Sequence, residues 1–79
     1  MLNELNRFIK DNEFSLTVYN NQIHIKNYLR IISLENNYIS FLTNNKKITI
    51  HGNDLSLKKL VIDEMLIEGK VSKIEVQND

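Results

Sequence analysis

The sequence contains no cysteine, no proline and no tryptophan, and it has only two glycines among its 79 residues. Without cysteine the chain forms no disulfide, no thiolate metal site and no thiol nucleophile. No apolar run approaches the roughly 20 residues of a membrane-spanning helix. Without proline, nothing in the sequence protects the edges of a sheet from further strand pairing. We therefore expect a soluble, cytoplasmic protein that does not insert directly into a membrane.

An excess of charge of one sign is also lacking, because ten Lys and Arg residues balance ten Asp and Glu residues. A neutral protein has no overall field that draws it to nucleic acid or to anionic lipid. A chain of 79 residues has room for one domain with a modest core. We expect a single domain, residues 1–79, to which self-association or a partner would add stability.

Residues 1–11 carry four apolar side chains at helical spacing. These are Leu2, Leu5, Phe8 and Ile9, and the spacing places them on one face of an amphipathic helix. About three helical turns are marginal alone, so the apolar face must dock on something. We expect a short N-terminal helix that either covers the sheet or docks on a partner protein.

From Phe14 onward, apolar residues recur at every second position, and this alternation predicts strands over residues 14–76. Asparagine or glycine pairs interrupt the alternation about every eight residues, a spacing typical of short antiparallel strands. Asn tolerates the positive φ of hairpin turns, and we expect it at Asn44. The predicted fold is mainly β: an antiparallel meander, as a small sandwich, curled sheet or partly open barrel, with a short N-terminal helix. The predicted turns are Asn20-Asn21, Asn36-Asn37, Asn44-Asn45 and Gly52-Asn53.

The two glycines, Gly52 and Gly69, lie near positions where the alternation of apolar and polar residues shifts by one residue. A glycine inside a strand, next to such a shift, usually marks a bulge that bends the sheet. We expect strong curvature in this half of the chain. At Gly69 we expect either a positive φ or a close approach of another backbone.

Few residues are candidates for chemistry. His24 and His51 lie on the polar phase of strands without a carboxylate at ligand spacing, whereas a metal site needs three or four converging ligands. The sequence shows neither a nucleophile elbow nor a phosphate-binding glycine loop. We therefore predict no catalytic residue, no metal and no cofactor. The acids near the C-terminus, which we interpret as a solvated edge, are Asp63, Glu64, Glu68 and Glu75.

An alternative function is the binding of single-stranded nucleic acid. Small β-barrels bind it with aromatic platforms beside a basic groove. The net charge of zero, and acids between the basic pairs, weigh against this alternative. The residues that would carry it are Tyr19, Tyr28, Tyr38, Phe41, Lys46-Lys47 and Lys58-Lys59.

One pattern runs through the second half of the sequence. It reads Ile48-x-Ile50-x-Gly52-x-x-Leu55, then Asp63-Glu64, then Leu66-Ile67-Glu68-Gly69-x-Val71-x-x-Ile74-Glu75. This order resembles the YabP/YqfC family of sporulation proteins. The acidic pair and the Leu-Ile-Glu-Gly run make the YqfC branch the closer likeness, and the sequence from about Phe14 onward fits more loosely.

The resemblance implies a small, non-enzymatic protein of endospore-forming Firmicutes that is needed for spore development. In that family the neighbours are often membrane proteins of the same programme, which implies a membrane-bound partner that recruits this chain to a membrane. Self-association into a homo-oligomer through strand edges is the other mode of binding that we expect. The positions that match the family pattern, and that we expect to determine the fold, are Ile48, Ile50, Gly52, Leu55, Gly69, Ile74 and Glu75.

Overall fold

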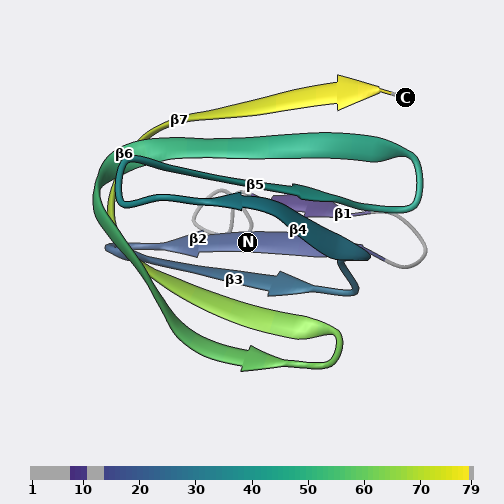
Figure 1. Cartoon of the computed structure of the whole chain (residues 1–79), viewed down its shortest axis with the longest axis horizontal. Helices are drawn as coiled ribbons and strands as arrows, with labels where there is room; N and C mark the ends of the chain where they lie inside the picture. The colour runs from purple at the N-terminus through teal and green to yellow at the C-terminus, as the bar shows by residue number, and fades with distance from the viewer. Residues whose placement is uncertain (1–7, 11–13, 79) are drawn as a thin grey trace, which may run out of the picture.

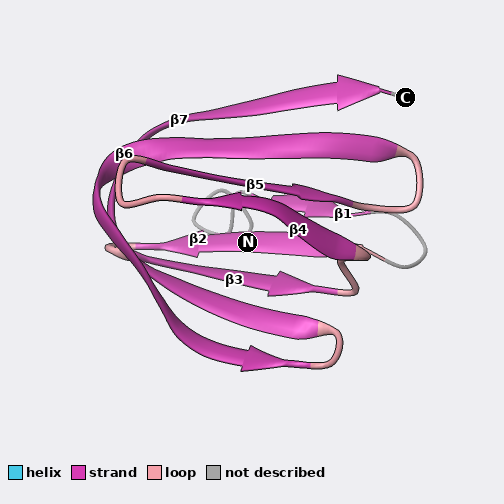
Figure 2. Cartoon of the chain, viewed as in Figure 1, coloured by secondary structure: helices cyan, strands magenta, loops and turns pink. Residues whose placement is uncertain are grey.

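The computed structural model describes residues 8–10 and 14–78, and every element in this part of the chain is a strand (Figure 2). The elements lie in one antiparallel sheet. They are β1 (Phe8–Lys10), β2 (Ser15–Tyr19), β3 (Gln22–Lys26), β4 (Arg30–Leu34), β5 (Tyr38–Leu42), β6 (Lys46–Val61) and β7 (Glu64–Asn78).

The prediction of an N-terminal helix is wrong. Phe8 and Ile9, which that prediction placed on the apolar face of the helix, lie in β1, where Phe8 pairs with Thr17 and Ile9 with Leu16 of β2. A helix of three turns is marginal in water, and the unpaired edge of β2 satisfies the backbone of these residues better. Leu2 and Leu5 lie outside the described residues.

The strand order is β1-β2-β3-β7-β6-β5-β4, so the sheet is not one meander. Strands β1 to β3 and β4 to β7 form two meanders, which the pairing of β3 with β7 joins. The long strands β6 and β7 both bend, and they carry the sheet from an upper to a lower layer (Figure 1). The upper layer contains β4, β5, the first half of β6 (residues 46–51) and the second half of β7 (residues 71–78). The lower layer contains β1, β2, β3, the first half of β7 (residues 64–68) and the end of β6 (residues 56–61).

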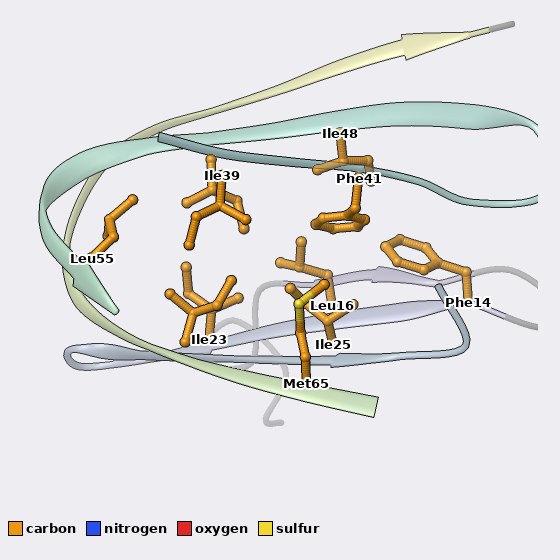
Figure 3. Packing of buried hydrophobic residues seen from close by; sticks show 11 residues of the cluster. Phe14, Leu16, Ile23, Ile25, Ile39, Phe41, Ile48, Leu55 and Met65 are labelled. Atoms are coloured by element: carbon orange, nitrogen blue, oxygen red, sulfur yellow. The ribbon is translucent and has the colours of Figure 1, made fainter. Parts of the chain in front are cut away.

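The core lies between these two layers, where apolar side chains of β2, β3, β5, β6 and β7 point inward (Figure 3). Ile39 and Phe41 of β5 descend from the upper layer, while Ile23 and Ile25 of β3 rise from the lower one. Phe41 also meets Phe14 at a ring-centroid distance of 6.1 Å. The buried apolar residues are Phe14, Leu16, Ile23, Ile25, Ile39, Phe41, Ile48, Ile50, Leu55, Met65 and Ile67.

Three of the four predicted turns fall between strands. Asn20-Asn21 connects β2 to β3, and the next two pairs lie between β4 and β5 and between β5 and β6. The turn predicted at Gly52-Asn53 is wrong, because β6 continues through it. The positive φ expected at Asn44 is also wrong. Among the described non-glycine residues, Asn27 (φ 65°) and Asp54 (φ 55°) adopt it.

The predicted curvature is confirmed where β6 and β7 turn between the layers. The pairing of the two strands shifts register between His51 and Gly52 and again between Asn53 and Ser56. A Cβ atom at Gly52 would overlap the carbonyl oxygen of Lys70 in β7. Gly69 has a φ of 145°, so both glycines allow the strands to approach closely at the bend.

Candidate interaction surface

An apolar cluster lies at the end of the molecule where β6 turns into β7. Ile62, in the turn, is 94% exposed, and Val61 and Leu60 before it are 45% and 51% exposed. The connection from β3 to β4 lies at the same end (Figure 1), and it contains Leu29, which is 62% exposed. We call Leu29, Leu60, Val61 and Ile62 the apolar tip.

Hydrogen bonds hold the two connections of the apolar tip together. The backbone N–H of Asn27 donates to the carbonyl of Asp63 in the β6–β7 turn (2.6 Å). The N–H of Leu29 donates to the carbonyl of Leu42 at the end of β5 (2.8 Å), which ties the β3–β4 connection to the upper layer. The hydroxyl of Tyr28 donates to the carbonyl of Val61 (3.3 Å). The left-handed backbone of Asn27 makes this turn possible. The tip is therefore a surface with a defined shape, built from residues far apart in the sequence.

Unpaired backbone is the second feature of the surface. Besides the outermost strands β1 and β4, two segments inside the long strands have a neighbour on only one side. Residues 70–78 of β7 pair with β6 alone, because the pairing of β3 with β7 stops at Glu68. Residues 56–61 of β6 pair with β7 alone. Such edges offer backbone donors and acceptors to a further strand.

Each histidine pairs with a glutamate of β7. His24 Nε2 lies 2.7 Å from Glu64 Oε2, and His51 Nε2 lies 2.8 Å from Glu75 Oε1. The hydrogen bond from His51, assisted by the charge of Lys73, lowers the pKa of Glu75. Neither pair could be recognised from the sequence, because the partners are 40 and 24 residues apart and meet only across paired strands. Among the described residues, no three His, Cys, Asp or Glu side chains come together as metal ligands.

The residues of the nucleic-acid alternative lie in different parts of the fold. Phe41 is buried in the core, and Tyr28 packs edge-on against it with the ring centroids 6.4 Å apart. Tyr38 lies beside His51 on the upper layer, whereas Tyr19 ends β2 in the lower one. The lysine pairs are likewise divided: Lys46-Lys47 begin β6, and Lys58-Lys59 lie beyond its bend.

A polar hollow of about 470 Å³ lies at the bend of β6 and β7. Two carboxylates, Asp54 and Glu68, and one ammonium group, Lys70, face it. Lys58 lies 3.6 Å from Glu68, so part of the negative charge is already balanced. The lining residues are Asn21, Asn53, Asp54, Ser56, Glu68, Gly69 and Lys70.

The family-pattern positions fall into three structural groups. Ile48, Ile50 and Leu55 are buried in the core, and Ile74 packs against it. Gly52 and Gly69 lie at the bend. Glu75 is exposed and bound to His51.

Comparison with known proteins gives one match. A family model described as the YabP family matches residues 10–79. No curated protein and no solved structure matches. The described part of the chain has no helix with the length and apolarity that crossing a bilayer requires.

Proposed function

The chain belongs to the YabP family, and from this premise we propose that it serves sporulation as a non-enzymatic module that binds a membrane-bound protein of the same programme. The observation that supports binding is the apolar tip. Several large apolar side chains exposed at one end of a small domain are a feature of protein interaction sites. Ile62, which is 94% exposed, would be the central contact.

The tip suits a protein partner because its shape is set before binding. The bonds from Asn27 to Asp63 and from Tyr28 to Val61 hold the β3–β4 connection beside the β6–β7 turn, so little conformational entropy is lost on docking. Burying a large apolar side chain completely contributes about 1.5–3 kcal/mol. Two or three such side chains would contribute about 3–9 kcal/mol. This is comparable to the cost of association, so contacts around the tip would add the remaining affinity.

The test compares the protein with Ile62→Ser in a pull-down from sporulating cells of the native organism. Membranes are solubilised in mild detergent, and captured membrane proteins are identified by mass spectrometry. Tyr19→Ser is the matched control, because Tyr19 is 51% exposed and precedes the β2–β3 turn at the opposite end (Figure 1). We expect the parent and Tyr19→Ser to capture the same membrane protein and Ile62→Ser to lose it.

Three results would overturn the proposal. In the first, Ile62→Ser captures the same membrane protein as the parent, and in the second the parent captures none. In the third, the pure protein floats with lipid vesicles and Ile62→Ser does not, so that the tip binds lipid instead of protein. Urea unfolding of each variant verifies that its fold is intact.

A further inference from the structure

We propose that residues 70–78 of β7, the β7 edge, pair antiparallel with the β7 edge of a second copy of this chain. The two sheets then become continuous across a two-fold axis at Ile74. This interface does not involve the apolar tip and stands independently of the partner proposed above.

The β7 edge is accessible along its whole length. It pairs with β6 on one side, from Asn53↔Lys70 to Lys46↔Asn78, and no other described strand pairs with it. From Lys73 to Asn78 this pairing has no register shift, so this part of the edge is regular, whereas Ser72 is an extra residue between the pairs of Val71 and Lys73. Figure 1 shows this part of β7 as the outermost strand of the upper layer. Its free N–H and C=O groups are a template for another strand.

Symmetry restricts how two copies of one strand can pair. In a two-fold antiparallel pair, each residue lies opposite the residue equally far on the other side of the axis. An axis at Ile74 overlaps residues 70–78 completely and places Lys73 of each copy opposite Glu75 of the other. An axis at Lys73 or at Glu75 would instead place like charges directly opposite, which is destabilising. The longest overlap and the charge complementarity therefore select the same register.

The side chains on both faces of the β7 edge fit this pairing. Lys73 and Glu75 lie on the outer face, 3.6 Å apart within one chain, and the second copy would add two such contacts across the axis. On the inner face, Ile74 pairs with Ile50 and Val76 with Ile48 of β6. Val76 remains 43% exposed at the margin of the core. A second copy would cover this margin with its own Ile74 and Ser72.

Two of the other described edges, residues 56–61 of β6 and strand β4, are less suited to self-pairing. The centre of residues 56–61 is Lys58-Lys59, so the registers with the most overlap place lysine opposite lysine. Strand β4 has only five residues, so it offers fewer backbone groups to a second copy than the β7 edge does.

Charge reversal tests the register directly. Sedimentation of the full-length chain over a range of concentrations gives the dimer dissociation constant. We expect a dimer for the parent, and at least a tenfold weaker one for Lys73→Glu and for Glu75→Lys, because each variant places like charges opposite one another. The double variant Lys73→Glu/Glu75→Lys should recover the parent value. An equimolar mixture of the two single variants should form a heterodimer, since all four opposed charges are then complementary.

Lys59→Glu, which reverses a charge on a different edge, is the control and should leave the dimer unchanged. Circular dichroism verifies that each variant keeps its strands. A parent that stays monomeric up to millimolar concentration overturns the inference. So does a dimer that Lys73→Glu leaves intact, or single variants that fail to form a heterodimer on mixing.

Discussion

Gly69 of β7 lies directly against the backbone of Leu55 in β6, where both strands turn from one layer to the other. A Cβ atom at Gly69 would lie 2.9 Å from Leu55 Cα and 2.7 Å from the carbonyl oxygen of Asp54. The φ of Gly69 is 145°, in a region that residues with a side chain rarely adopt. Both the space and the backbone conformation therefore require glycine at this point of the bend.

Gly69→Ala should lower the free energy of unfolding by about 1–3 kcal/mol or more, because alanine brings both backbone strain and a clash with β6. Urea unfolding followed by circular dichroism measures the loss. Lys70→Ala, at the exposed neighbouring position, is the control and should change stability by less than about 0.5 kcal/mol. Equal midpoints for Gly69→Ala and the parent would show that the bend does not depend on this glycine.

Asn27→Val should destabilise the fold by about 1–2 kcal/mol, because Asn27 has a left-handed φ of 65° that strains a β-branched residue. Asn27→Gly should be close to neutral. Asn44→Val serves as the comparison, and without a positive φ at Asn44 it should cost less than about 0.5 kcal/mol. Urea midpoints rank the three variants, and a larger loss at Asn44 than at Asn27 would contradict this assignment of backbone conformations.

Phe41→Ala should cost about 3–5 kcal/mol, because it removes a fully buried ring between the two layers. Its ring meets Phe14 at 6.1 Å and Tyr28 at 6.4 Å. A domain of this size has little more stability than that, so we expect the variant to be largely unfolded at room temperature. Thermal melts give the result, and Phe41→Leu should remain folded with a lowered midpoint. A cooperative melt of Phe41→Ala near the parent midpoint would contradict the central place of this ring.

Glu75→Gln should reduce stability near pH 6 and make no difference in strong acid. The hydrogen bond from His51 and the charge of Lys73 hold the pKa of Glu75 in the folded protein below its ordinary value of 4.5. A lowered folded pKa contributes stability above the unfolded pKa, and this stability is lost as the pH falls through the folded value. Urea midpoints at pH 6 and pH 3, at a concentration where the chain is monomeric, should differ from the parent more at pH 6 than at pH 3. A difference of the same size at both values would contradict the role of this carboxylate.

The sequence alone was sufficient for the β character of residues 14–76, for three turns and for the special backbone at Gly69. Alternation of apolar residues is local, and it already places Ile23, Ile25, Ile39 and Phe41 on the inward face of their strands. Asn20-Asn21 could be recognised as a turn because both sides of it alternate. The pattern from Ile48 to Glu75 was also sufficient to identify the family. The match of the family model to residues 10–79 confirms this identification.

Only the tertiary structure decided which strands pair and where the long strands bend. A glycine beside a slip in the pattern fits a turn as well as a bulge, and at Gly52 the close approach of Lys70 makes it a bulge. Apolar spacing favoured a helix around Phe8, but the open edge of β2 draws this segment into the sheet. His24 and Glu64 are brought together by the pairing of β3 with β7, which depends on contacts between distant parts of the chain. Local propensity acts over a few residues, whereas strand partners are set by the burial of one shared core.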